Sequence, residues 1–279
     1  TLLRAVAGLL AARSGDVRID GRSIVNLPPQ RRRVAVVFQD DALLPHLSLR
    51  KNLQLVARRK RDGGAAIEET AIALEVQELL ARRPAHCSGG ERQRASIARA
   101  LLSDPRALLL DEPFAHLDPR LRHRVRDEVV RLRRTFDGPI VYVTHDHAEG
   151  MSVADAVAVI IEGRIEDQGE PQRVYDRPSS VAVARIFGDR PMNLFDDDNV
   201  TLGIRPEFVE VASDGELPGR VVARETTGAD AFIAVETVRG RIVARVRAAN
   251  GVRGGDLVAL RLPQSALRRF DAQTGRAIA

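Results

Sequence analysis

The sequence predicts an α/β domain, built on a parallel sheet with flanking helices, followed by a small all-β barrel. Strand-like apolar runs alternate with helical patterns as far as residue 167, and this alternation is typical of a parallel sheet. From Val200 onward, short segments of alternating polarity are separated by Gly, Asp or Pro turns, which is typical of a small barrel. The 279 residues, 44% hydrophobic and 29% charged, suffice for one large and one smaller domain.

Composition excludes several classes of protein. The sequence has no apolar run of the length that crosses a bilayer, and its single cysteine, Cys87, excludes an internal disulfide framework. A net charge of +5 is compatible with nucleic-acid binding, but aromatic residues make up only 4% of the chain and offer few platforms for base stacking. We therefore predict no nucleic-acid partner. Arginine clusters such as Arg31 to Arg33 are expected to form solvated faces, the alternative being some contact with a membrane partner or lipid headgroups.

The first hundred residues predict mostly helices around one buried strand. An amphipathic helix is expected at 2–10, a strand and turn at 17–21, and a buried β-branched strand from Val34 to Gln39. An apolar loop follows at 41–47. Apolar residues at helical spacing then predict helices at 49–60 and 67–82, separated by Gly63-Gly64.

A Ser-Gly-Gly turn opens the next predicted helix, which runs from Ser88 to Leu102. Such a turn presents unpaired backbone N–H groups and the positive end of a helix dipole, and both favour a phosphate. The alternative is an ordinary surface helix with Ser88 as its N-cap. Cys87, just before the turn, is expected to be a small apolar filler, with a redox-sensitive thiol as the alternative.

A second candidate site follows the apolar run that starts at Ala107. This run delivers two adjacent carboxylates, Asp111 and Glu112, before Pro113. A carboxylate pair at the end of a strand suits a hydrated metal ion and a base for an attacking water. The alternative is a buried parallel strand that ends in an ordinary turn.

The remaining segments complete the two predicted domains. An arginine-rich helix is expected at 120–136 and a buried strand at 139–143, just before His145. A hairpin at 156–167 and a short helical tail at 169–188 follow, and the acidic run at 196–198 is interpreted as a linker. The predicted barrel strands lie at 200–204, 208–211, 219–225, 232–238, 240–247 and 257–262.

Together these motifs resemble the nucleotide-binding subunit of ATP-binding cassette (ABC) transporters. Ser88 to Glu91 resembles the family signature, Leu108 to Glu112 its Walker B strand, and Ala115 to Asp118 its D-loop. Leu202 to Glu207 and Phe270 to Gly275 resemble the TOBE-type barrel of importer ATPases, particularly those for sugars and glycerol phosphates.

The resemblance implies a domain organisation. A P-loop NTPase-type parallel sheet is expected in a nucleotide-binding domain at 1–190, with a helical subdomain at about 48–104. A linker at 191–199 and an OB- or TOBE-like barrel at 200–279 follow.

The resemblance also implies ATP and Mg²⁺ as cofactors, with a role for each matching residue. Glu112 would activate the attacking water, and His145 would reach the γ-phosphate. Asp111 and Gln39 would hold the metal, and Gln39 would also contact the water. Thr1, which would directly follow the phosphate-loop Lys-Ser, would lie at the nucleotide. The signature turn, Ser88, Gly89 and Gly90, would contact nucleotide together with Glu91, a position where Gln is commonest in the family. Asp118 would signal across the subunit interface.

The implied function is an ATPase that energises import of a small solute, of the sugar or glycerol-phosphate type, with molybdate, sulfate, polyamine or iron as alternatives. The implied partners are a permease bound through the Gln39–Leu47 region, a second ATP-binding subunit and, indirectly, a solute-binding protein. The implied location is the cytoplasmic face of the cell membrane. No glycine-rich phosphate loop precedes Thr1. We therefore expect a segment truncated at its N-terminus and inactive as given, the alternative being a non-catalytic regulatory subunit.

Overall fold

The computed structural model describes residues 1–38, 42–57, 62–113, 122–188 and 190–278. The chain divides into two compact units, Thr1–Val153 and Ala154–Ala279. This division falls before the predicted domain boundary at residue 190, because helix α8 (Val181–Ile186) packs on residues of the second unit, Met192 and Phe270. Within the described residues, no helix is long and apolar enough to cross a membrane.

The first unit is built on the predicted parallel sheet. Its strands are β3 (Val34–Val37), β4 (Ala107–Asp111) and β5 (Ile140–Val143), in the order β3-β4-β5. In the parallel register Val37 pairs with Leu110, and Asp111 pairs with Val143. The carboxyl ends of the three strands therefore lie along one edge of the sheet, where the candidate catalytic residues follow β4 and β5.

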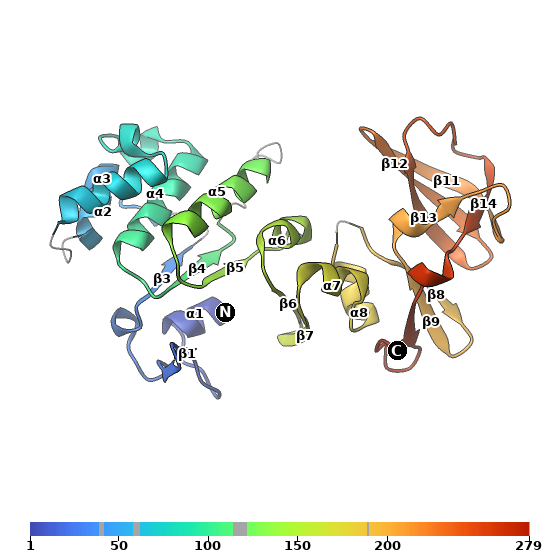
Figure 1. Ribbon diagram of the computed structural model, residues 1–279, viewed down its shortest axis with the longest axis horizontal. Coiled ribbons are helices and arrows are strands. Elements are labelled where there is room, and N and C mark those ends of the chain that lie inside the picture. Colours follow the sequence, from blue (N-terminus) through green and yellow to red (C-terminus); the bar gives the residue numbers. More distant parts are fainter. Residues whose placement is uncertain (39–41, 58–61, 114–121, 189, 279) are drawn as a thin grey trace. The chain divides into compact units, whose positions relative to one another are not determined.

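Helices cover both faces of this sheet because strand side chains alternate between the faces. Leu108 and Leu110 are fully buried in a core shared with the helices that follow β3, whereas Leu109 packs with Leu3 and Ala7 of helix α1 (Leu2–Ala7). Figure 1 shows α1 on one side of β3–β5 and α2 to α4 on the other. By the same alternation, Asp111 belongs to the face that α1 covers.

The helices of the first unit confirm most of the predicted segments. They are α2 (Leu49–Ala57), α3 (Gly63–Ala73), α4 (Gly89–Leu102), α5 (Arg122–Thr135) and α6 (His147–Val153). The predicted helix at 67–82 is wrong in its second half. There α3 ends at Ala73, the backbone of Glu75 turns left-handed (φ 53°), and a short 3-10 helix follows at Gln77–Leu79.

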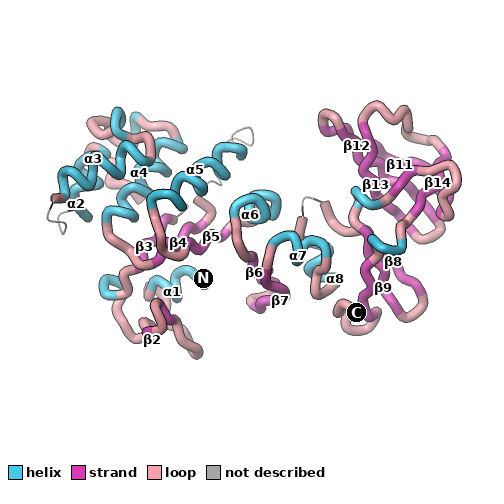
Figure 2. The backbone as a smooth tube through the Cα atoms, viewed as in Figure 1, coloured by secondary structure: helices cyan, strands magenta, loops and turns pink. Residues whose placement is uncertain are grey.

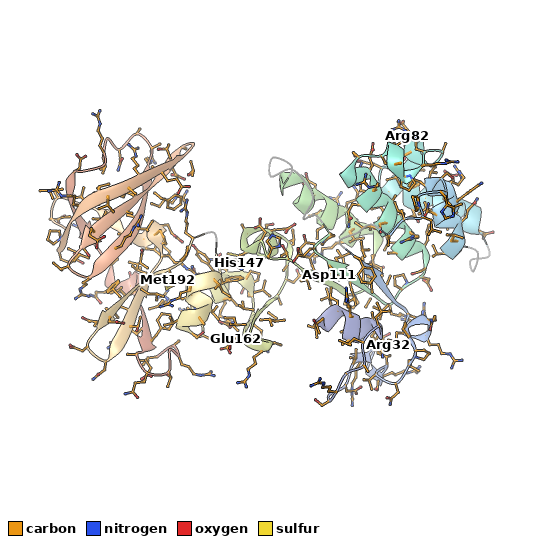
Figure 3. All side chains as sticks on the ribbon, turned by 180° about the vertical axis from the view of Figure 1, so that it is seen from behind. Arg32, Arg82, Asp111, His147, Glu162 and Met192 are labelled. Atoms are coloured by element: carbon orange, nitrogen blue, oxygen red, sulfur yellow. The ribbon has the colours of Figure 1, made fainter. Side chains whose placement is uncertain are left out.

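Arg32 corrects the expectation that its arginine cluster is a solvated face. Its side chain is buried and donates to four backbone oxygens, those of Ala5 and Val6 at 2.8 Å each and those of Val25 and Leu27. Two of these carbonyls lie at the C-terminal end of α1, where helix carbonyls lack intrahelical partners. Arg32, labelled in Figure 3, thus joins α1 to the segment before β3.

The second unit is mostly antiparallel β-structure. After the predicted hairpin β6 (Val157–Ile161) and β7 (Arg164–Gly169) come helices α7 (Pro171–Asp176) and α8. The remaining strands are β8 (Asn193–Asp197), β9 (Val200–Ile204), β10 (Glu210–Val211), β11 (Leu217–Thr227), β12 (Asp230–Thr237), β13 (Gly240–Arg247), β14 (Leu257–Arg261) and β15 (Arg268–Asp271). They form sheets of order β10-β14-β11-β12-β13 and β15-β9-β8, drawn in magenta in Figure 2. The predicted fold class is confirmed.

The predicted linker at 191–199 contains strand β8, which pairs antiparallel with β9. The acidic run that indicated a linker lies at the tip of this hairpin, where Asp198 adopts a left-handed backbone (φ 54°). Asn193 at the start of β8 is buried and bonds to the β13 backbone, accepting from Val243 N at 2.7 Å and donating to Val243 O at 2.8 Å. This side chain connects the two sheets, and Phe195, Leu202 and Ile204 also pack in one core with residues of the larger sheet.

Candidate functional site

The Ser-Gly-Gly turn begins helix α4 through a complete capping box. Ser88 Oγ accepts from the Glu91 N–H at 3.3 Å, and the Ser88 N–H donates to Glu91 Oε2 at 2.6 Å. The bond from the Ser88 backbone is the largest cause of the lowered pKa of Glu91, and the charges of Arg82 and Arg94 act in the same direction. The carboxylate of Glu91, the residue that departs from the commonest signature, therefore accepts a hydrogen bond at the start of its own helix and compensates the positive end of the helix dipole.

The capping box leaves Gly89 and Gly90 as the free donors of the turn. Their N–H groups occupy the first two positions of the helix, which have no intrahelical acceptors. A Cβ atom built on Gly89 would meet no atom of the described residues within 4 Å. The turn is therefore open beside Gly89 and places two backbone donors at the positive end of a 14-residue helix, which is an arrangement suited to a phosphate.

The sheet edge brings Glu112 and His145 together. Glu112 directly follows β4, and its N–H donates to Val143 O of the neighbouring strand at 3.0 Å. Its carboxylate Oε2 lies 3.2 Å from Nδ1 of His145, two residues beyond β5. Glu112 also has a left-handed backbone (φ 46°), a conformation that costs a non-glycine residue about 1–2 kcal/mol and is frequent at functional sites.

A hydrogen-bond network that sequence reasoning missed supports the turn containing His145. Glu149 of α6 accepts hydrogen bonds from the hydroxyls of Tyr142 and Thr144, the latter at 2.6 Å. The Asp146 N–H donates to Thr144 Oγ1 at 3.0 Å, and Asp146 Oδ1 accepts from the Glu149 N–H at 3.0 Å. Burial, and then the bond to Glu149, raise the pKa of Tyr142. Residues on both sides of His145 are thereby held to α6.

The carboxylates at this edge fit a hydrated magnesium ion. Mg²⁺ in nucleotide sites commonly takes one or two protein carboxylates, with waters and phosphate oxygens as the other ligands. Asp111, partly exposed at the end of β4, provides one such carboxylate. Among the described residues no three His, Cys, Asp or Glu side chains gather into a ready metal cluster. Gln39, the other predicted ligand, lies outside the described residues.

The predicted permease loop is organised by Asn52, which the sequence analysis also missed. Asn52 is fully buried on α2; its Oδ1 accepts from Leu44 N at 2.8 Å, and its Nδ2 donates to the carbonyls of Leu44 and Ser48. Arg99 of α4 donates to Ala42 O at 2.8 Å. Leu44 remains 38% exposed, so the loop holds an apolar side chain in solvent on a fixed backbone.

Of the remaining residues that the sequence analysis singled out, some are described by the structure and some are not. Thr1 is exposed at the N-cap of α1 and makes no capping bond with its side chain. Asp118 and the rest of the predicted D-loop lie outside the described residues. Cys87 lies in the core of the first unit, where burial raises the pKa of its thiol, as expected of an apolar filler.

Comparison with known proteins agrees with this geometry. Residues 1–115 match the family model described as ABC transporter, and residues 202–270 match that of the TOBE domain. The chain is 38% identical to sn-glycerol-3-phosphate import ATP-binding protein UgpC 1 of Rhizobium etli, over 99% of this chain and 86% of the relative. It is 36% identical to the UgpC protein of Chromobacterium violaceum, over 100% of this chain and 84% of the relative. The chain therefore belongs to the ABC transporter family of ATP-binding proteins and carries a TOBE domain.

Proposed function

We propose that this protein is the ATP-binding and ATP-hydrolysing subunit of an importer for a glycerol phosphate. The observation that carries the proposal is the sheet edge, where a carboxylate, Glu112, is held 3.2 Å from an imidazole, His145, beside a second carboxylate, Asp111. The relatives named as sn-glycerol-3-phosphate import proteins support the choice of solute, and they cover nearly the whole chain. The relatives cited above are not named for sugar, molybdate, sulfate, polyamine or iron import.

Each side chain then has a role in hydrolysis. Glu112 accepts the proton of the attacking water, and its one-third exposed carboxylate is accessible to that water. His145, 75% exposed, turns from Glu112 toward the γ-phosphate. Asp111 and Gln39 hold Mg²⁺, which supplies charge neutralisation when bound. Thr1, at the start of α1, would lie near the phosphates, because it follows the phosphate-loop position in the family.

The signature turn acts on a different nucleotide from the one that Glu112 serves. In the ABC architecture two subunits pair head to tail, and Ser88, Gly89 and Gly90 of one subunit donate to the γ-phosphate held by the other. The open space in front of Gly89 supports this role, because the donors need an acceptor from outside the chain. Glu91 keeps the turn in shape, and Asp118 communicates across the pair.

The Gln39–Leu47 region, of which the structure describes residues 42–47, docks the permease at the cytoplasmic face of the membrane. A solute-binding protein acts on the permease from the other side. The fixed backbone and exposed Leu44 support this docking role. No comparison favours the non-catalytic alternative, since the similar proteins are named ATP-binding import proteins.

The proposal is tested by uptake in cells. A strain lacking the native gene is complemented with the wild-type gene or with Glu112→Gln, and uptake of radiolabelled glycerol 3-phosphate and of maltose is followed. We expect the wild-type gene to restore glycerol phosphate uptake and Glu112→Gln to reduce it by a factor of about 10²–10⁴, or to background. Unchanged glycerol phosphate uptake in the deleted strain would contradict glycerol phosphate as the transported solute. Full activity of Glu112→Gln would contradict the proposed role of Glu112 in hydrolysis.

A further inference from the structure

The second unit contains a pocket that includes no residue of the proposed nucleotide site. Its volume is about 380 Å³, within the range of pockets that take small molecules. Three arginines line it, and they come from three places in the fold: Arg185 in the last turn of α8, Arg190 before β8, and Arg241 on β13. The fold thus brings Arg241 to the same cavity as Arg185 and Arg190, about fifty residues earlier.

Only one of these arginines is neutralised within the part of the chain that the structure describes. Arg190 pairs with Glu225 at 2.8 Å and stacks over the Phe232 ring at 4.4 Å. Glu236 stands opposite Arg241 in the β12–β13 register. Even so, neither Arg241 nor Arg185 makes a side-chain hydrogen bond or ion pair within 4.0 Å of another described residue. Among the described residues, two arginines of the lining therefore have no ion-pair partner.

The chemistry of the lining favours a phosphate ester. Guanidinium groups present planar pairs of N–H donors that match phosphate oxygens. A phosphate monoester carries a charge of about −1.5 to −2 at neutral pH, which matches these two arginines. A monocarboxylate carries only one charge and two acceptor oxygens, and so leaves one guanidinium unmatched.

The apolar part of the lining is built on a fixed backbone. Met192 (labelled in Figure 3) is buried, and Leu194 and Val243 line the pocket beside it. Asn193, between Met192 and Leu194, is locked to Val243 by two bonds shorter than 3 Å. The pocket wall where β8 meets β13 is therefore preformed, and it offers carbon surface to the body of a ligand whose phosphate meets the arginines.

We infer that this pocket binds a small phosphate monoester, with Arg185, Arg190 and Arg241 on the phosphate and Met192 and Leu194 against its carbon atoms. The inference goes beyond the proposed function, because the site uses no residue of the nucleotide site. Its test needs no ATP hydrolysis, so the two proposals fail independently.

Calorimetric titration of the full chain with glycerol 3-phosphate, inorganic phosphate and lactate tests the site. We expect both phosphates to bind and lactate not to bind. Arg241→Gln and Arg185→Gln should each weaken phosphate binding about tenfold or more, since each removes charged hydrogen bonds. Arg247→Gln is the matched control. It lies exposed on the same strand, six residues and about 20 Å from Arg241, and should change the affinity less than twofold.

Three outcomes overturn the inference. The first is the absence of saturable binding at millimolar phosphate. The second is equal weakening by Arg241→Gln and Arg247→Gln, which indicates attraction to net charge alone. The third is binding to phosphatidate vesicles that Arg241→Gln abolishes while soluble phosphates do not bind, which assigns the arginines to a lipid surface. Thermal unfolding shows whether each variant is folded. If the Arg241→Gln protein does not fold, the Arg185→Gln protein tests the site independently.

Discussion

The two halves of the proposed nucleotide site are held in different ways. At the signature turn the supporting bonds are local: the capping box joins Ser88 to Glu91, three residues apart, and Arg92 donates to Cys87 O, five residues away. At the sheet edge, Glu112 and His145 are 33 positions apart in the sequence and meet because β4 and β5 pair in parallel. The first geometry depends on one helical turn, whereas the second depends on the core of the whole unit.

Because of this difference, substitutions at the turn and at the sheet edge should have different effects on the structure. Removing a side chain from the turn should loosen α4 locally and leave the sheet intact. Removing one from the core under β4 should disturb Asp111 and Glu112 together, although neither is substituted. The four predictions below test this contrast, from the largest expected effect to the smallest, by unfolding and by amide hydrogen exchange.

Leu110→Ala should have the largest effect. Leu110 is fully buried beneath the end of β4, next to Asp111. Its loss should lower the free energy of unfolding by about 2–5 kcal/mol, because a cavity is added to the lost burial. Denaturant unfolding followed by circular dichroism measures the change. Val141→Ala on β5, at a side chain that is 43% exposed, is the control and should cost less than about 1 kcal/mol. Equal losses of stability in the two variants would contradict the dependence of the sheet edge on the core beneath β4.

Tyr142→Phe should come second. The substitution keeps the ring but removes the hydroxyl that donates to Glu149, leaving a partly buried carboxylate with one bond fewer. We expect a loss of about 1–2 kcal/mol in the free energy of unfolding, with faster amide exchange at 144–149. Ser152→Ala removes an exposed hydroxyl from the same helix and serves as the control. Unchanged exchange in the Tyr142→Phe protein would show that the network does not hold the turn.

The same contrast explains what the sequence could predict. The capping box at Ser88 and Glu91 follows from a pattern of four residues, so both the turn and the start of α4 were predicted. The apolar run before Asp111 likewise predicted β4 and the carboxylates at its end. The contact of Glu112 with His145 was not predicted, because neither segment reveals which strands are neighbours in the sheet. The family resemblance implied only a role for each residue.

Two of the features that sequence reasoning missed depend on distant partners. Arg32 was expected in solvent and is buried, because the carbonyl groups that accept its bonds include those at the end of α1, 26 and 27 residues earlier. Asn193 was assigned to a linker and instead joins β8 to β13, 50 residues later. A polar residue in a polar stretch gives no local sign of such a partner, so burial of this kind becomes visible only in the structure.

Ser88→Ala should have a smaller effect than either sheet substitution. The loss of an N-cap side chain costs about 1 kcal/mol, and the damage should be confined to the first turn of α4. Amide exchange should accelerate at Gly89 to Arg92 and stay unchanged in β4 and β5. Ser103→Ala at the other end of the same helix removes a hydroxyl that bonds only to Ala100 O and is the control. Faster exchange throughout the sheet would contradict the local character of the turn.

Glu91→Gln should have the smallest effect and the clearest dependence on pH. Glutamine keeps an acceptor for the Ser88 N–H but loses the charge, so the wild-type protein should be more stable by about 0.5 kcal/mol at neutral pH. The pKa of Glu91 is lowered on folding from its ordinary value of 4.5. Its stabilising contribution is therefore fully present above pH 4.5 and is lost as the pH falls through the lower folded value. Denaturant unfolding of both proteins between pH 3 and 7 should show the difference in stability shrinking in acid.

In the active transporter, turnover of the Glu91→Gln protein should change no more than a few-fold, because the Glu91 carboxylate is bonded to its own helix start. Abolished turnover would instead show that Glu91 takes part in the chemistry.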